Sequence, residues 1–203
     1  MNSTASPTGR GKLRPEDLFS LEQYAKQRAE FRPKVIAHKR PRNVQCGPNA
    51  MLCFEDRLTV QYQVQEMLRI ERIFESEGIA DELAAYNPLI PDGTNWKATL
   101  LVEFPDADER RAALASLKGV EDRCWVQVSG HERVFAIADE DLERENEEKT
   151  SSVHFLRFEL TPAMVVSAKG GAAVSIGMDH DAYRHAIDPL PQAARDALVG
   201  DLA

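Results

Sequence analysis

Four charged residues of opposite sign share one expected helix over residues 57–76: Glu66, Arg69, Glu71 and Arg72. At about 100° per residue, both glutamates fall among the apolar side chains of this helix. A carboxylate on a buried face must be ion-paired, hydrogen-bonded or protonated. The four residues are therefore candidate catalytic residues, with the glutamates as general acid/base or metal carboxylates. The alternative, which we favour, is a structural ion pair with Arg157 or with an arginine of the first helix.

A second group of candidate ligands surrounds an expected hairpin turn: Asp179, His180, Asp181 and His185. Carboxylates and imidazoles can hold a divalent metal, but aspartate and histidine are also ordinary turn residues. We therefore expect no metal and no cofactor. The alternative hypothesis is a metal site formed by these four residues. Arg157 and Tyr183 are candidate binding residues. His154 shares a strand face with apolar residues, which predicts a hydrogen-bonded core histidine.

Known enzyme signatures are absent from the sequence. No glutamate has a histidine three residues later, as a four-helix di-iron site requires. The sequence also lacks a glycine-rich phosphate loop, a Gly-x-Ser-x-Gly elbow and a His-Glu-x-x-His helix. Cys46, Cys53 and Cys124 are an odd number without a Cys-x-x-Cys pair, so we expect free thiols. Whether the chain is an enzyme stays open.

Helices and short antiparallel strands must position these side chains. Ser20 and Gln23 have capping-box spacing for a first helix over 21–40, which Pro33 should kink or break. Further helices are expected at 57–76 and 80–86, a strand at 97–104, and hairpins at 124–138 and 172–187. The fold class is α+β: an antiparallel sheet of hairpins packed with several α-helices, one of them long and mostly buried near residues 57–76. We expect a disordered tail over residues 1–14 and a single domain over 15–203.

Charge is distributed unevenly along the chain. Residues 1–45 carry 10 basic and 4 acidic groups, whereas residues 46–203 carry 15 and 29. The basic segment 34–42, with Lys34, Lys39, Arg40 and Arg42, could bind nucleic acid. We favour the alternative, in which this segment docks on the acidic body, and expect no nucleic-acid partner. No apolar run approaches the roughly 20 residues that span a bilayer, and no secretory signal precedes the fold, so we expect a cytoplasmic protein without a membrane partner.

Several stretches resemble a bacterial family catalogued as a domain of unknown function, DUF3501. They are Gln65 to Ile73, Gln23 to Ile36, Gly47 to Asn49, Glu82 to Asn87 with Ile90 and Pro91, Phe155 to Phe158, and Asp179 and His180 with Tyr183. The resemblance covers about residues 13 to 203 and implies a shared fold, but it brings no catalytic or binding residues. The family's genes often lie beside rubrerythrin-like and iron–sulfur oxidoreductase genes, which implies an association with redox or peroxide stress.

Three hypotheses about function follow. The leading one is a non-catalytic accessory or binding protein in a redox or peroxide-stress setting, with an unknown protein partner and a homodimer as the expected oligomer. The second is an enzyme with a carboxylate/arginine pocket around Glu66 and Glu71. The third is a nucleic-acid binder that uses residues 34–42.

Overall fold

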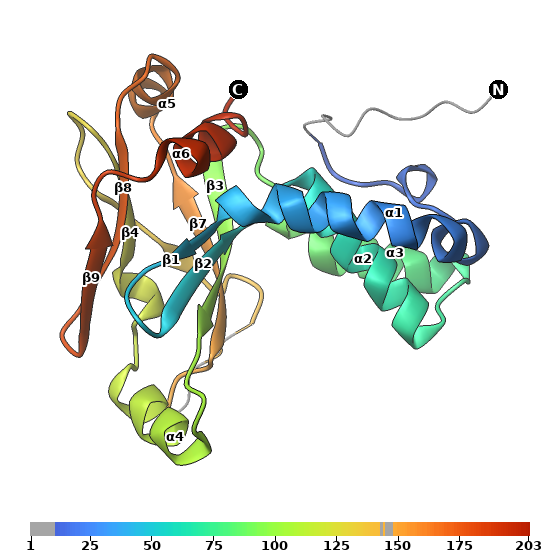
Figure 1. Ribbon diagram of the computed structural model, residues 1–203, viewed down its shortest axis with the longest axis horizontal. Helices are drawn as coiled ribbons and strands as arrows, with labels where there is room; N and C mark the ends of the chain where they lie inside the picture. Colours follow the sequence, from blue (N-terminus) through green and yellow to red (C-terminus); the bar gives the residue numbers. More distant parts are fainter. Residues whose placement is uncertain (1–10, 143, 145–147) are drawn as a thin grey trace.

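The molecule has two lobes (Figure 1). The computed structural model describes residues 11–142, 144 and 148–203. Residues 11–39 and 57–90 form a helical lobe, and the other described residues form a β lobe. The chain therefore crosses between the lobes three times, at residues 39–40, 56–57 and 90–91.

The described residues contain six α-helices and two antiparallel sheets, so the predicted α+β class is confirmed. The α-helices are α1 (Leu21–Lys39), α2 (Arg57–Glu71), α3 (Ser76–Tyr86), α4 (Ala107–Ser116), α5 (Pro162–Lys169) and α6 (Gln192–Val199). Short 3-10 helices are η1 (Pro15–Asp17), η2 (Arg40–Arg42), η3 (Asn87–Leu89) and η4 (Glu121–Arg123). The strands are β1 (Asn43–Gln45), β2 (Ala50–Phe54), β3 (Asn95–Val102), β4 (Cys124–Val128), β5 (Val134–Phe135), β6 (Ile137–Ala138), β7 (Val153–Glu159), β8 (Val174–His180) and β9 (Tyr183–Ile187).

The β lobe encloses the larger hydrophobic core between its two sheets. Their strand orders are β1-β2-β3-β7-β6 and β5-β4-β8-β9. Strands β5 and β6 are edge strands of different sheets and follow each other in the chain, so the two sheets meet along these edges. Inward positions alternate along β3, where Trp96, Ala98, Leu100 and Val102 are buried, as strand geometry requires. The Trp96 indole N–H donates to the carbonyl of Leu198 at 2.8 Å, which fixes α6 against this core.

The helical lobe has a smaller apolar cluster of its own, built on Val60, Val64, Leu68 and Leu83. The Ser20 hydroxyl accepts from the Gln23 backbone N–H, and the Gln23 side chain accepts from the Ser20 N–H, so the predicted capping box is present. Of the kink or break predicted at Pro33, the break is wrong, because α1 continues through this residue to Lys39.

The predicted helix near residues 57–76 is present and most of its residues are buried or half-buried, but it is shorter than expected. Helix α2 ends at Glu71 because Arg72 adopts a left-handed conformation with φ of 58°, and α3 begins at Ser76. Ile70 and Phe74 are 63% and 72% exposed. Helices α1 and α3 both contact α2, and the exposed part of α2 among the described residues is its last turn, Arg69 to Glu71.

The N-terminal prediction is tested only at its end, because residues 1–10 lie outside the described residues. Leu13, which we placed in the tail, belongs to the fold. Its side chain is buried, and its N–H donates to Oδ1 of Asn87 at 2.7 Å. Within the part of the chain that the structure describes, no helix has the length and apolar character needed to cross a membrane.

Candidate functional site

Glu66 of α2 is held by the first helix. Its Oε1 accepts from Nε of Arg28 at 2.7 Å and from the hydroxyl of Tyr24 at 2.5 Å, and its Oε2 accepts from Nη2 of Arg28 at 2.8 Å. The hydrogen bonds from Arg28 lower the pKa of Glu66 to about 2. Both carboxylate oxygens therefore have partners, and the favoured interpretation, an ion pair with an arginine of the first helix, describes Glu66.

The other three candidates of this helix do not gather with Glu66 into a pocket. Arg69 is 43% exposed, and its Nη2 lies 3.7 Å from Oε2 of Glu66. Glu71 and Arg72 are exposed. The prediction that Glu71 is buried is wrong, because the helix ends at that residue and the side it occupies is not covered.

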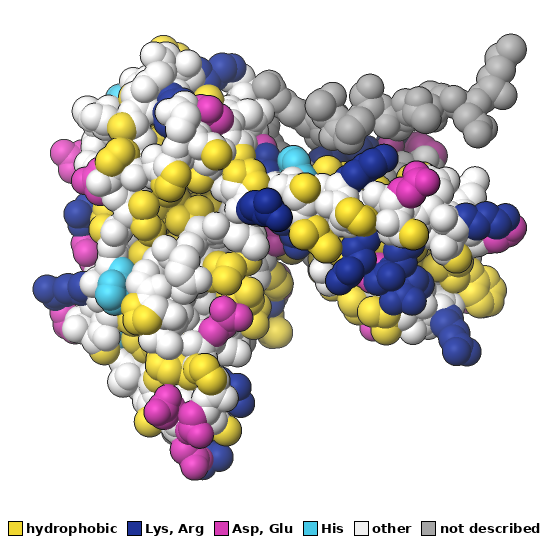
Figure 2. Space-filling model, in the orientation of Figure 1, with side chains coloured by type: hydrophobic (Ala, Val, Ile, Leu, Met, Phe, Trp, Pro, Cys, Tyr) yellow, Lys and Arg dark blue, Asp and Glu magenta, His cyan; other side chains and the backbone are white. Residues whose placement is uncertain are grey.

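Part of the basic segment 34–42 docks on the β lobe. Arg42 is buried, and its guanidinium donates to both carboxylate oxygens of Asp201 at 2.8 Å. Asp56 lies 3.0 Å from the same guanidinium, and its Oδ2 is 2.5 Å from Nε2 of His38. The exposed basic side chains that remain in this segment are Lys34 and Arg40. In Figure 2, basic side chains also gather on the middle of the helical lobe.

The candidate metal ligands near residue 180 each have another partner. Asp179 pairs with Arg133, and Asp181 pairs with Arg184 at 2.6 Å. Nε2 of His180 lies 3.0 Å from the carbonyl of Lys118. The hairpin between β8 and β9 thus separates these side chains instead of collecting them.

His185 packs on the ring of Tyr183, with 4.6 Å between the ring centroids. The hydroxyl of Tyr183, our other candidate binding group, donates to the carbonyl of Cys46 and accepts from the N–H of Asn49, both at 2.9 Å. Tyr183 therefore joins β9 to the turn between β1 and β2.

A different group of ligand atoms meets around His154, which is fully buried on β7. Its Nδ1 lies 2.6 Å from Oδ2 of Asp139, and its Nε2 lies 3.0 Å from the carbonyl of Ser151 and 3.7 Å from Oε2 of Glu121. Among the described residues, Glu121, Asp139 and His154 are the set whose ligand atoms lie close enough to hold a metal. Both ring nitrogens already face protein oxygens, so the arrangement fits the predicted hydrogen-bonded core histidine.

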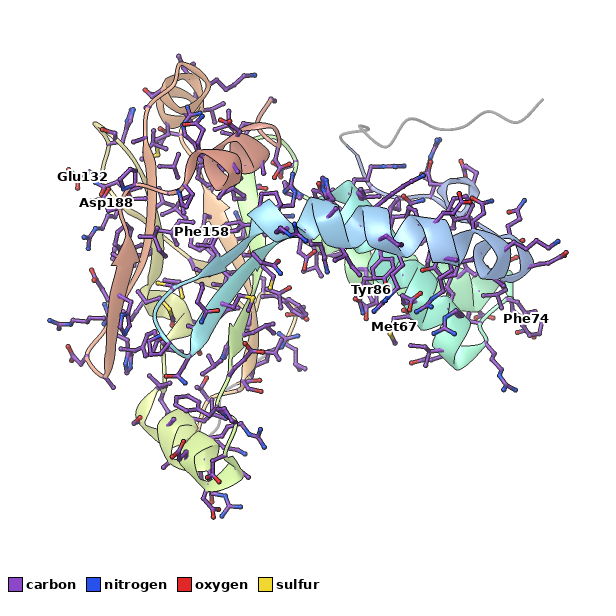
Figure 3. All side chains as sticks on the ribbon, in the orientation of Figure 1. Met67, Phe74, Tyr86, Glu132, Phe158 and Asp188 are labelled. Carbon is purple, nitrogen blue, oxygen red and sulfur yellow. The ribbon has the colours of Figure 1, made fainter. Side chains whose placement is uncertain are left out.

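A cavity of about 520 Å³ lies where the two lobes meet. Its apolar wall consists of Ala85, Tyr86, Pro88 and Leu89 from the helical lobe and Phe155 and Leu156 from β7. Figure 3 places Tyr86 on the side of the helical lobe that faces the sheets, and Phe74 at the far tip. Cavities of this size, with apolar walls and a few polar groups, are typical of small-molecule sites.

Five charged side chains line the same cavity: Glu82, Lys97, Glu140, Asp141 and Arg157. Arg157 donates to both oxygens of Glu140 at 2.8 Å, and Nζ of Lys97 donates to the carbonyl of Pro88 at 2.6 Å. Asp141 accepts from both terminal nitrogens of Arg144, at 2.6 and 2.7 Å. Four of the five therefore already have partners.

Glu82 differs from these four side chains. Its Oε2 is buried and has no hydrogen-bond partner among the described residues. Burial raises the pKa of Glu82, and the neighbouring carboxylates of Glu71 and Asp81 raise it further. Among the charged side chains that line the cavity, Glu82 is therefore the one with a buried oxygen that accepts no hydrogen bond from the described residues.

Comparison with known proteins agrees with this fold. The family model described as "Protein of unknown function (DUF3501)" matches residues 12–202. The chain belongs to the DUF3501 family. A crystal structure of a novel protein of unknown function from Burkholderia pseudomallei is 50% identical to this DUF3501 member, with a TM-score of 0.89 over 95% of this chain and 100% of that chain. No curated protein matches at a significant level. The resemblance predicted from the sequence is thus confirmed.

Sequence reasoning placed one residue of the DUF3501 cavity, Arg157, among the candidates and missed Glu82. A signal for Glu82 exists in helix α3, because it lies three residues after Ile79 and four before Tyr86, both of which pack on the smaller cluster. A carboxylate at that spacing must lie beside the packed face.

Proposed function

We propose that this DUF3501 member is a non-catalytic protein that binds a small organic molecule in the cavity between its lobes. The observation that carries the proposal is Glu82 in the wall of a partly apolar cavity, with its Oε2 buried and without a hydrogen-bond partner among the described residues. An unsatisfied buried acceptor costs roughly 1–3 kcal/mol, and more when it is charged. A ligand that donates a hydrogen bond to Glu82 would recover part of this free energy.

The positions of the other candidates favour a binding role over the two alternatives. An enzyme centred on Glu66 needs a carboxylate that is free to exchange a proton or contact substrate, whereas Glu66 accepts three hydrogen bonds from Arg28 and Tyr24. A nucleic-acid binder that uses segment 34–42 needs its cations exposed; Lys34 and Arg40 are exposed, but Arg42 is buried against Asp201 and is not available to a phosphate.

The redox or peroxide-stress setting is a separate part of the proposal and is supported by the family resemblance alone. The cysteines offer it no support, because burial raises the pKa of the Cys46 and Cys53 thiols to about 11 and also raises that of Cys124. Deletion of the gene followed by peroxide challenge tests this setting. Unchanged peroxide sensitivity of the deletion strain would contradict the redox setting. The expected homodimer is tested separately by light scattering, and a monomer would contradict it.

The binding site itself is tested by filling it. Ala85 is exposed on α3 and lines the cavity, so Ala85→Trp should block the space without disturbing a core. We expect a mixed set of neutral, anionic and cationic fragments to include binders to the wild-type chain in ligand-observed NMR. These signals should disappear in Ala85→Trp while its Tm stays unchanged. Fragments that bind both forms equally, or no binding fragment at all, would overturn the proposed function.

A further inference from the structure

We propose that the cavity between the lobes is selective for a small amphipathic amine, whose protonated nitrogen donates to Glu82 and whose apolar body lies against Tyr86, Leu89 and Phe155. This inference rests on the proposed function and adds the chemical class of the ligand. The first argument is which of the five charged side chains in the cavity wall already have partners within the protein. Arg157 is paired with Glu140, Asp141 is paired with Arg144, and Lys97 donates to the carbonyl of Pro88, whereas Glu82 has a buried oxygen that lacks a partner among the described residues.

The second argument is the sign of the surrounding charge. Glu71 from α2 and Asp81 from α3 both act on Glu82, and each adds negative charge on that side of the cavity. An anionic ligand group would be repelled there, whereas a cation would be attracted and would favour the ionised form of Glu82. Of the two cations in the lining, Lys97 is held by the carbonyl of Pro88 and Arg157 by Glu140.

The third argument is hydrogen-bond capacity. An ionised carboxylate only accepts, so the Glu82 side chain in the cavity wall can be satisfied only by N–H or O–H donors. A primary ammonium group carries three donors and a full positive charge, whereas a quaternary ammonium group carries the charge without a donor. The geometry therefore favours primary or secondary amines over quaternary ones, and the aromatic rings of Tyr86 and Phe155 in the wall suit a ligand with a flat apolar body.

The test compares three ligands of one shape with different charge: 2-phenylethylamine, 2-phenylethanol and 3-phenylpropionate. Calorimetry on the full chain at neutral pH should show the amine binding most tightly, the alcohol more weakly and the anion not at all. Glu82→Gln should lower the affinity for the amine at least tenfold and leave the affinity for the alcohol unchanged. The matched control is Glu77→Gln, an exposed glutamate of the same helix, which should change neither.

Acidification supplies a second readout. Amine binding should weaken as the pH falls through the raised pKa of Glu82, because the protonated carboxyl loses its charge. This dependence should be absent in Glu82→Gln, whose Tm should equal or exceed that of the wild type because it removes a buried unpartnered charge. The amine inference is overturned if the alcohol or the anion binds as tightly as the amine, or if Glu82→Gln leaves amine affinity unchanged. If all three ligands bind and Ala85→Trp abolishes them equally, the proposed function survives and only the amine selectivity fails.

Discussion

The ion pair between Glu66 and Arg28 should be a major source of stability for the helical lobe. Because one pKa unit corresponds to about 1.4 kcal/mol, a pKa of about 2 in the folded chain against an ordinary 4.5 sets an upper limit of about 3 kcal/mol. The Arg28 side chain is 33% exposed, so water screens the pair on that side. We therefore expect Glu66→Gln to destabilise the fold by about 2 kcal/mol at neutral pH.

The pH dependence of this loss has a defined sign. The folded-state pKa of Glu66 is lowered, so its stabilising contribution is complete above the unfolded value of 4.5 and is lost as the pH falls towards about 2. The difference in free energy of unfolding between wild type and Glu66→Gln should therefore shrink to less than half its neutral value at about pH 3. Using the difference between the two proteins removes the contributions of all other titrating groups that they share.

Urea denaturation followed by circular dichroism, near neutral pH and near pH 3, measures both quantities. Glu71→Gln is the matched control on the same helix, and because Glu71 is exposed its effect should stay within about 0.5 kcal/mol. The reasoning is refuted if Glu66→Gln behaves like this control, or if its effect is equally large at both pH values.

Two further substitutions test the β lobe and its junction. Arg42→Met should destabilise the fold by about 3–5 kcal/mol in chemical denaturation, because it leaves Asp201 buried without its partner. The double variant Arg42→Met/Asp201→Leu should recover most of this loss, and equal losses in both would contradict the argument. Gly177→Ala should destabilise the fold by about 1–3 kcal/mol, because its Cβ would overlap the ring of Trp125. A thermal melt equal to that of Gly11→Ala, whose added methyl group meets nothing within 4 Å, would show this to be wrong.

The features that the sequence predicted correctly depend on neighbours along the chain. The capping box of Ser20 and Gln23 involves residues three apart, and it is present. The strand expected at 97–104 is present as β3 over Asn95–Val102, where Ala98 and Leu100 are buried on one side of the pleat. Such features need no knowledge of what packs against the element.

Burial of α2 could not be predicted in the same way. The helical wheel locates Glu66 and Glu71 relative to apolar neighbours, but it does not show which side another element covers. Helix α1 packs where Arg28 reaches Glu66, while Glu71 lies at the end of α2 and beyond that contact. The class of partner for Glu66 was therefore predicted correctly, whereas the exposure of Glu71 was not predicted.

The cavity was also beyond sequence reasoning, because its walls are distant in the chain. Glu82 and Tyr86 come from α3, whereas Phe155 and Arg157 come from β7, which lies beside Lys97 only because β3 and β7 pair. Strand pairing and the docking of the lobes create the site. Neither is encoded in local spacing.

The three crossings between the lobes limit how the cavity can change its width. Arg42 fixes the first crossing to Asp201, and at the second Glu55 accepts hydrogen bonds from the hydroxyls of both Thr59 in α2 and Thr99 in β3. After the third, the carbonyl of Gly93 accepts from the N–H of Ala203 at 2.9 Å. These bonds anchor the chain to the β lobe beside each crossing, so the helical lobe is joined through three separated connections and rotation about any one of them is restrained by the other two. We therefore expect the cavity to keep its width when a ligand binds. Such a site selects ligands by shape before contact and binds without waiting for closure, so association should follow a single phase whose rate rises linearly with ligand concentration.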